Sequence, residues 1–234
     1  MKNKKQRLTH FFACIACITG LLLNSSQLTA QTNAIKADDF VASIGINVNN
    51  NQPTFAQFFQ LERSVYFPMI GALGVRYVRQ STDTGSINIA TELYNKYGVK
   101  ALLGTGRMLP SSLWPEQKLD TSQINQEITD MKKIPVSAII AIEGTNEYDL
   151  MHGTTMDPTW WLTLRNYFTT ESVRIRSDAV LKNIPIIGPA LTSEAAEDSV
   201  GNLDPYIDYA GLHIYVGGFC PEEPAGTTGA RIVS

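Results

Sequence analysis

The sequence predicts an α/β fold, a (β/α)8 barrel of the TIM type that is incomplete, with about six strand–helix units present. Short apolar runs alternate with segments whose apolar residues recur at helical spacing. The repeat is about 30 residues long, which favours parallel strands joined by crossover helices. A doubly wound open sheet is the alternative, but it usually carries a phosphate-binding glycine cluster after its first strand, and the sequence has none there.

Six predicted strands follow one another along the chain. The fourth, residues 139–142, is continuously apolar, as expected for a strand that is buried on both faces of a parallel sheet. Residues 194–208 carry only a weak pattern and are expected to form a connection. The six predicted strands span residues 40–48, 73–79, 99–104, 139–142, 184–189 and 209–215.

The predicted helices are placed by their capping residues. The first begins near Pro53, and the second ends at Gly98, which suits a left-handed cap. Asp120 or Thr121 caps the third helix, and the fourth begins at Asp157, which is followed by proline. Helical spacing predicts an inner face of the fourth helix that consists of Trp161, Leu164, Phe168, Ile175 and Ala179.

The first 30 residues have the features of a secretory signal peptide. A basic start is followed by an apolar run, residues 11–23, that is too short to cross a bilayer comfortably, and by a polar segment ending at Ala30. Cleavage after Ala30 leaves one barrel domain of residues 31–234, expected to be secreted or periplasmic. A lipoprotein would need a cysteine at the end of the apolar run, whereas Cys14 and Cys17 lie inside it.

Charge and composition exclude several kinds of partner. Signal cleavage removes four basic residues and no acidic ones, which takes the formal net charge from −3 to −7. That charge disfavours nucleic acid and anionic membrane as partners. Cys220 is the one cysteine left, so the exported chain cannot form an internal disulfide and depends on its core. The sequence has no His-x-His pair, cysteine cluster or Asp-rich calcium loop, and neither a metal nor a cofactor is expected.

Polar side chains stand at the carboxyl ends of three predicted strands, where barrel enzymes carry their catalytic residues. Asn146 and Glu147 follow the fourth strand, Arg79 closes the second, and His213 and Tyr215 close the sixth. A glutamate held partly out of water beside a second carboxylate has a raised pKa, as the general acid of glycoside cleavage requires. Asn146 can hydrogen-bond a sugar hydroxyl, and Arg79 can orient a carboxylate. A structural alternative is that the Asn-Glu pair merely closes a loop.

Four motifs carry a resemblance to a known family. They are Gly-Thr-Asn-Glu from Gly144, Gly-Val-Arg-Tyr-Val-Arg ending at Arg79, Gly-Pro-Ala-Leu from Gly188, and Gly-Leu-His-Ile-Tyr from Gly211. With these motifs in this order, residues 44–218 resemble the large clan of retaining glycoside hydrolases built on the eight-fold barrel.

The resemblance implies a secreted glycoside hydrolase that cleaves O-glycosyl bonds of an oligo- or polysaccharide by a retaining, two-carboxylate mechanism. It implies that Glu147 is the general acid/base and that Asn146 contacts the sugar beside it. Arg79 and Tyr215 would support the nucleophile, and His213 would donate to the sugar or to the nucleophile.

The chain departs from the family pattern at two places. Similar proteins often carry a histidine where this chain has Asn49, which is expected to contact substrate. The family's nucleophile is a glutamate at the end of a seventh strand, and Glu222 and Glu223 do not match it because no helix separates them from the sixth strand. The chain is therefore expected to be an N-terminal fragment that lacks the nucleophile and has no turnover by itself.

Three further residues each have two interpretations. Glu143 is a rival for the acid role, although a structural ion pair with Arg76 or Arg79 is favoured. Trp114 is a candidate platform for a sugar ring, because an aromatic face packs against the C–H face of a pyranose. Trp160 either provides such a platform or packs within its helix.

Two other function classes remain open. One is a catalytically silent carbohydrate-binding barrel that keeps Asn146, Trp114 and Tyr215 for sugar contacts. The other is a Schiff-base aldolase, which is disfavoured because no lysine ends a predicted strand and Lys100 lies near the start of its own. The coding sequence past Ser234 discriminates between them: an apolar strand ending in glutamate within roughly 30 to 60 further residues supports the hydrolase.

Overall fold

The chain divides into two compact units, residues 1–40 and residues 41–234. The computed structural model describes residues 36–48, 62–108, 118–152 and 157–211. In the first unit these residues form the start of helix α2 (Ala37–Ala42), whose first turn contains Asp38 and Asp39. Negative charge at this position is favourable because the amino end of a helix is electropositive.

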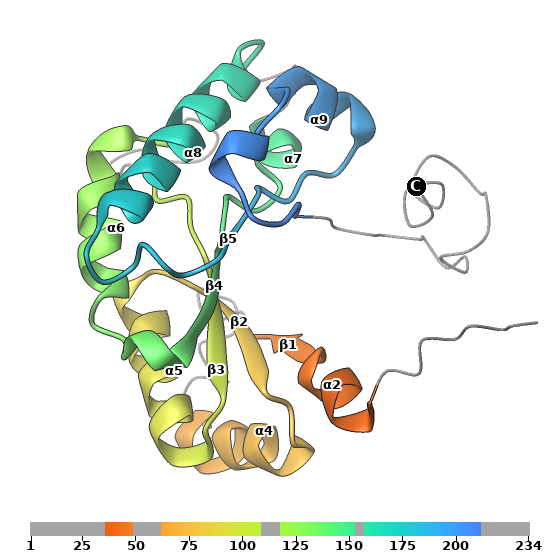
Figure 1. The fold of residues 1–234 in the computed structure, drawn as a ribbon, viewed down its shortest axis with the longest axis vertical. Coiled ribbons are helices and arrows are strands. Elements are labelled where there is room, and N and C mark those ends of the chain that lie inside the picture. Colours follow the sequence, from red (N-terminus) through yellow and green to blue (C-terminus); the bar gives the residue numbers. More distant parts are fainter. Residues whose placement is uncertain (1–35, 49–61, 109–117, 153–156, 212–234) are drawn as a thin grey trace, which may run out of the picture. The chain divides into compact units, whose positions relative to one another are not determined.

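The second unit contains a sheet of five parallel strands (Figure 1). The strands are β1 (Gly45–Asn47), β2 (Tyr77–Ser81), β3 (Lys100–Gly104), β4 (Ile139–Glu143) and β5 (Ile186–Ile187). Their order in space is their order in the sequence, and every neighbouring pair is parallel. The predicted α/β fold with a parallel sheet is therefore confirmed.

Helical segments connect the strands. They are η2 (Glu62–Tyr66), a π-helix, followed by α4 (Phe67–Leu73), α5 (Thr84–Tyr97), η3 (Thr121–Gln123), α6 (Ile124–Met131), η4 (Val136–Ala138), α7 (Tyr148–His152), α8 (Trp160–Ser177), α9 (Glu194–Val200) and η5 (Asp204–Tyr206). None of the helices in the described part of the chain is long and apolar enough to span a bilayer.

One face of the sheet is buried under helices. Leu103, Ile142 and Ile186 point to this face and belong to a core cluster that also contains Ile124 of α6 and Leu164 of α8. A smaller core lies beside β2 and consists of Phe67, Ile70, Val78, Ile89, Leu93 and Val99. The helical connections thus supply the apolar cover that a parallel sheet requires.

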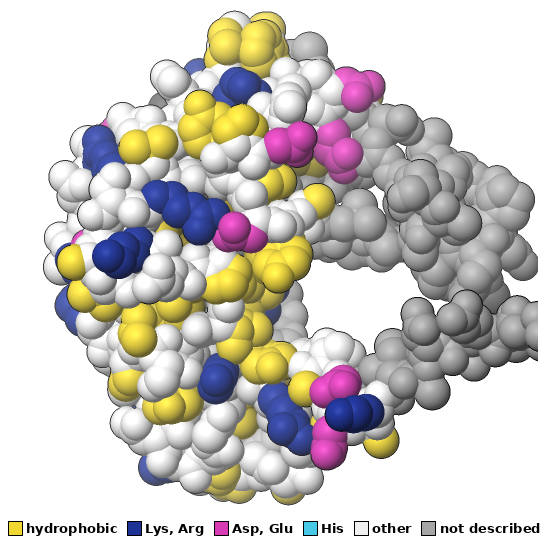
Figure 2. All heavy atoms as spheres, viewed as in Figure 1, with side chains coloured by type: hydrophobic (Ala, Val, Ile, Leu, Met, Phe, Trp, Pro, Cys, Tyr) yellow, Lys and Arg dark blue, Asp and Glu magenta, His cyan; other side chains and the backbone are white. Residues whose placement is uncertain are grey.

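The outer surface of the helical layer is mixed in character. In the view of Figure 2, apolar, basic and acidic side chains are interspersed over the described residues. Several basic side chains of the helices form ion pairs with carboxylates, such as Lys132 with Asp178 at 2.8 Å.

Three predicted strands begin at least two residues later than expected, and the fifth predicted strand contains only Ile186–Ile187 instead of residues 184–189. Residues 40–42 belong to helix α2, and β1 contains only Gly45–Asn47. Leu73 ends α4, and Gly74 caps that helix in the left-handed conformation with φ of 70°. The second strand therefore starts at Tyr77, and it continues two residues past Arg79, which was wrongly predicted to close it.

The predicted helix boundaries agree better with the structure. Gly98 caps α5 with φ of 70°, and the Asp120 carboxylate accepts from the backbone nitrogen of Ser122. The Asp157 carboxylate accepts from the nitrogen of Thr159 at 2.9 Å just before α8. Ala179 is exposed and lies beyond α8, so its assignment to the inner face was wrong. The predicted start of the first helix near Pro53 lies outside the described residues.

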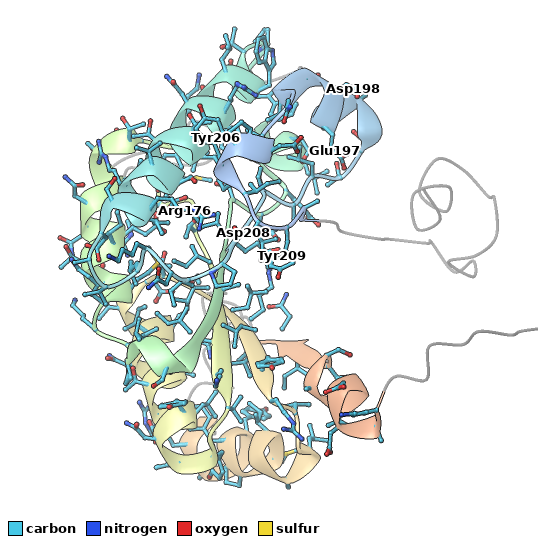
Figure 3. All side chains as sticks on the ribbon, viewed as in Figure 1. Arg176, Glu197, Asp198, Tyr206, Asp208 and Tyr209 are labelled. Carbon is cyan, nitrogen blue, oxygen red and sulfur yellow. The ribbon has the colours of Figure 1, made fainter. Side chains whose placement is uncertain are left out.

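The weakly patterned connection contains helix α9 and leads to the start of the predicted sixth strand. Tyr209 forms a parallel bridge with Ile187 of β5, and the Gly188 nitrogen donates to the Tyr209 oxygen at 2.8 Å. Asp208 fastens this segment, because its Oδ2 accepts from Arg176 of α8 at 2.6 Å and from the Ile186 nitrogen at 2.7 Å (Figure 3). The chain beyond residue 211 is outside the described residues.

Candidate functional site

Three polar side chains meet at the carboxyl end of β4, beside the middle of β2. The Arg79 guanidinium forms an ion pair with the Glu143 carboxylate through Nε, and its Nη2 donates to Asn146 Oδ1 at 2.9 Å. The side chains of Arg79 and Glu143 are 21% and 7% exposed, so the ion pair is largely shielded from water. A charged pair in such surroundings is held more firmly than one on the surface.

Strand register brings these groups together. Glu143 lies opposite Gly104 in the β3–β4 pairing, and Arg79 lies two residues before Ser81, which pairs with Gly104 from the other side. A Cβ on Gly104 would lie 3.9 Å from Arg79 Nη2 and 4.0 Å from Glu143 Oε2. The missing side chain at Gly104 therefore leaves room for the ion pair to cross over β3.

Close packing fixes the chain immediately after β4. A Cβ on Gly144 would lie 2.8 Å from the ring of Phe168 and 2.8 Å from the nitrogen of Pro189, so the strand end touches both α8 and the segment after β5. Asn146 forms a parallel bridge with Ala190, and the Glu147 nitrogen donates to the Ala190 oxygen at 2.8 Å. These contacts hold Asn146 at a defined distance from Arg79.

Glu147 has a strained backbone. Its φ is +44°, and it is the one non-glycine residue with positive φ in the described part of the chain. A side chain in this region costs about 1–3 kcal/mol, and such residues cluster at active sites and ligand clamps. The residue is half-buried, and helix α7 starts directly after it with Tyr148, whose pKa is raised to about 12 by burial.

The structure brings together some of the predicted site residues. Arg79 and Asn146 are in contact, and Glu147 follows Asn146 in the chain. Glu143 is paired with Arg79, which confirms the structural interpretation of this glutamate. Trp160 is 5% exposed and belongs to the core, which confirms that it packs within its helix. Four further predicted site residues lie outside the described residues: Asn49, Trp114, His213 and Tyr215.

Sequence reasoning missed two buried carboxyl groups near this edge of the sheet. Glu127 of α6 and Glu171 of α8 are 0% and 1% exposed. Their spacing was the available signal: Glu127 falls on the stripe of Ile124, Ile128 and Met131, and Glu171 falls three residues after Phe168 and four before Ile175. An acidic residue on the apolar stripe of a helix indicates a buried carboxyl group.

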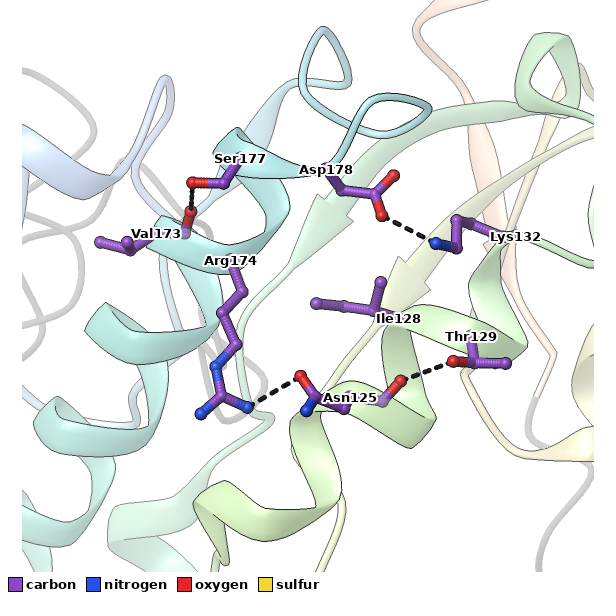
Figure 4. Close-up of a pocket in the computed structure, with 8 residues that line it drawn as sticks. All are labelled: Asn125, Ile128, Thr129, Lys132, Val173, Arg174, Ser177 and Asp178. Carbon is purple, nitrogen blue, oxygen red and sulfur yellow. Dashed lines mark hydrogen bonds and ion pairs between the residues drawn. The ribbon is translucent and has the colours of Figure 1, made fainter.

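A surface hollow of about 430 Å³ lies elsewhere, between α6 and α8 (Figure 4). Its polar side chains bond to neighbouring groups: Arg174 Nη1 donates to Asn125 Oδ1 at 3.0 Å, and Lys132 pairs with Asp178 at 2.8 Å. Neither Arg79, Asn146 nor Glu147 lines it. We therefore place the candidate site at the carboxyl end of β4, beside Arg79 of β2.

The described residues contain no group of three or more His, Cys, Asp or Glu side chains that could hold a metal ion. The arrangement at β2 and β4 instead offers a carboxyl group on a strained residue, an oriented amide and a guanidinium. Such groups can transfer a proton and bind hydroxyls.

Comparisons with protein-family models and with curated proteins give no match to this chain.

Proposed function

We propose that the protein is an exported glycoside hydrolase that acts on an oligo- or polysaccharide by the retaining mechanism, with Glu147 as general acid/base. The observation that carries the proposal is the contact of Arg79 with both Glu143 and Asn146, directly beside the strained Glu147. The resemblance of the four sequence motifs supplies the reaction class.

The proposal includes the barrel architecture. The five strands lie in sequence order and are all parallel, as in a barrel, whereas a doubly wound sheet reverses its strand order at a switch point. The bridge between Ile187 and Tyr209 extends the order in the same direction. In such a barrel Arg79, Asn146 and Glu147 stand at the catalytic face.

The hydrogen bond from Arg79 defines the role of Asn146. A guanidinium has only donors, so the atom that it contacts must be the amide oxygen of Asn146. The amide nitrogen is thereby directed away from Arg79 and can donate to a sugar hydroxyl. Hydrogen bonds of this kind strengthen as the sugar ring approaches the transition state.

Glu147 would protonate the leaving oxygen and later deprotonate the attacking water. The resemblance assigns the nucleophile to a glutamate at the end of a seventh strand, and the described residues comprise five strands and the start of a sixth. The ion pair with Arg79 gives Glu143 a positioning role, since it holds the guanidinium that orients Asn146.

A second candidate is a catalytically silent carbohydrate-binding protein. It is favoured by the fact that Glu143 is engaged with Arg79, because that arrangement orients Asn146 for binding without requiring a nucleophile.

The proposal is tested with Glu147→Gln and, as a matched control, Glu92→Gln, which replaces a half-buried glutamate of α5 that pairs with Arg63 and Lys96. The purified chain, and the chain extended by any coding sequence past Ser234, are assayed on nitrophenyl glycosides and on unactivated oligosaccharides. Glu147→Gln should slow cleavage of the oligosaccharides about 10²–10⁴-fold and spare the nitrophenyl substrates, whose leaving group needs no proton. Equal loss on both substrates contradicts the acid role, and sugar binding without turnover by the extended chain supports the silent binder.

A further inference from the structure

The two buried carboxyl groups, Glu127 and Glu171, form a contact between helices α6 and α8. They are 0% and 1% exposed, and their side chains lie within hydrogen-bonding reach of each other. Two carboxylates that both carry a negative charge cannot form a hydrogen bond, because neither has a proton to donate. A close contact of this kind in a buried site therefore calls for one proton between them.

The surrounding donors are divided unequally between the two groups. Glu127 accepts from Tyr167 Oη at 2.5 Å, from the Thr82 hydroxyl and from the Gly106 nitrogen at 3.3 Å. Glu171 accepts through Oε2 from the Thr105 hydroxyl at 2.8 Å.

The other oxygen of Glu171, Oε1, is buried and has no donor among the described residues. Three donors stabilise a negative charge on Glu127, whereas Oε1 of Glu171 is the oxygen that can carry a proton and donate it. This assignment accounts for a buried polar atom that otherwise has no partner.

The basic side chain near the two glutamates, Arg107, is bonded to other groups. The Arg107 guanidinium donates to Asp130 Oδ2 at 2.7 Å and to the Thr82 oxygen at 2.7 Å, and Asp130 also binds Lys133 at 2.6 Å. The Arg107 backbone nitrogen, by contrast, donates to Tyr167 Oη at 3.1 Å, which leaves the hydroxyl proton for Glu127. No ion pair with either glutamate is found among the described residues that could replace the proton.

We propose that Glu127 and Glu171 share one proton in the folded protein and thereby form a pH-sensitive latch that joins α6 and α8 to the turns after β2 and β3. The groups in contact come from all four segments: Glu127 from α6, Tyr167 and Glu171 from α8, Thr82 after β2, and Thr105 and Gly106 after β3. Loss of the proton places two negative charges in an enclosed site and drives the segments apart. The latch is independent of the reaction that the protein catalyses.

Burial raises the pKa of Glu171 well above the ordinary value of 4.5, and the neighbouring charge of Glu127 raises it further. In the unfolded chain the same carboxyl group loses its proton near its ordinary value. The folded state thus holds more protons than the unfolded state above about pH 4.5, and stability falls as pH rises toward the pKa of the folded state. For one proton, the unfolding equilibrium constant increases about tenfold per pH unit in this window.

The test compares urea unfolding of the wild-type chain and Glu171→Gln between about pH 5 and pH 8. Glutamine reproduces the protonated acid, because its amide can donate to Glu127 and accept from Thr105. The two proteins should have similar free energies of unfolding at pH 5. At higher pH, the unfolding equilibrium constant should rise about tenfold more per pH unit in the wild type than in the variant. Parallel pH profiles would overturn the proposal.

Two further proteins keep the test informative. Glu127→Gln removes the neighbouring negative charge, so the wild-type loss of stability at high pH should become smaller, though not vanish, because burial of Glu171 remains; this variant keeps the test open even where Glu171→Gln does not fold. Glu92→Gln is the control. Hydrogen bonds from Lys96 and Arg63 lower the pKa of Glu92, so this substitution should alter the pH dependence of stability in acid and not at alkaline pH.

Infrared spectroscopy reads the proton directly. The wild type at neutral pH should show a carbonyl band of a protonated carboxylic acid that is missing from Glu171→Gln. Stabilisation of the wild type, but not of Glu171→Gln, by added Mg²⁺ or Ca²⁺ at neutral pH would instead identify a bound cation between the carboxylates and overturn the shared proton.

Discussion

Replacing Gly144 by alanine is expected to destabilise the protein, whereas the same change at Gly104 is tolerated. A Cβ on Gly144 would lie 2.8 Å from ring carbons of Phe168 and 2.8 Å from the Pro189 nitrogen. The ring is 2% exposed and packed in the core, and a backbone nitrogen cannot move aside, so the added methyl forces the strand end to shift. Overpacking of this kind typically costs about 1–3 kcal/mol.

Gly104 is a matched control at the end of the neighbouring strand. A Cβ there would meet the Gln80 oxygen at 3.6 Å and Arg79 Nη2 at 3.9 Å, which are ordinary contact distances, and neither glycine has a positive φ. Alanine at Gly104 should therefore leave stability unchanged or raise it by up to about 1 kcal/mol, because it restricts the unfolded chain.

The measurement is thermal unfolding followed by circular dichroism, with urea midpoints as a second readout. For a domain of this size each kcal/mol shifts Tm by about 2–4 °C, so Gly144→Ala should lower Tm by about 2–12 °C. Equal melting temperatures for the two variants would refute the reasoning, because they would mean that Phe168 or the segment after β5 yields freely. If the dependence of the unfolding free energy on urea concentration is the same in both variants as in the wild type, the same native state is being compared.

Three further predictions concern charge and strain near the site. Arg79→Met leaves Glu143 buried without its partner and should cost about 3 kcal/mol in urea unfolding at neutral pH, and adding Glu143→Gln should recover most of the loss; simple additivity of the two effects would contradict the pairing. Glu147→Gly relieves a backbone held at φ of +44° and should stabilise the protein by about 1 kcal/mol, whereas Glu147→Ala should not; Tm values of the two variants decide this. Hydrogen bonds from Lys118 and Thr159 lower the pKa of Asp157 to about 2, so its carboxylate stabilises the fold above about pH 3.8. This contribution, at most about 2 kcal/mol, disappears as pH falls toward 2. In a pH series of urea midpoints, Asp157→Asn should abolish this part of the loss of stability in acid.

The sequence predicted the strands and helix ends that depend on local chemistry. Gly98 ends α5 because a left-handed residue satisfies the last turn of a helix, and Asp120 begins the following helical segment because its carboxylate accepts a hydrogen bond from the Ser122 backbone nitrogen. Residues 139–142 were predicted to form a buried strand from their continuous apolar pattern, and they lie in β4, where all of them except the half-buried Ile140 are buried.

The errors came from residues whose structure depends on distant partners. Residues 40–42 were predicted to be strand from their apolar character, but β1 begins only at Gly45, where pairing with Tyr77 begins. Likewise Gly74, Val75 and Arg76 form a connection after α4, and the second strand starts at the residue that pairs with Lys100. Parallel pairing is set by neighbouring strands, which a single sequence does not reveal.

The candidate site was predictable in position but not in its contacts. Parallel strands end at one edge of a sheet, so Arg79 and Asn146 could be expected to lie near each other. Their direct hydrogen bond depends on the register of β3 between them, which does not follow from the sequence of β2 or β4 alone.

The two faces of the sheet give the strongest physical reason to propose a barrel rather than an open sheet. Val78, Leu103 and Ile142 point to one face and are buried under helices, whereas on the other face Ala141 is buried and Leu102 and Ile187 are half-buried. A doubly wound sheet would cover this second face with helices as well.

Arg79, paired with Leu102 across the strands, points to the same half-buried face. Helices packed there would bury its guanidinium in an apolar layer, whereas a barrel mouth leaves it beside Glu143 at the rim, where it is 21% exposed. The partial exposure of a charged side chain among apolar neighbours thus favours a face that closes on other strands.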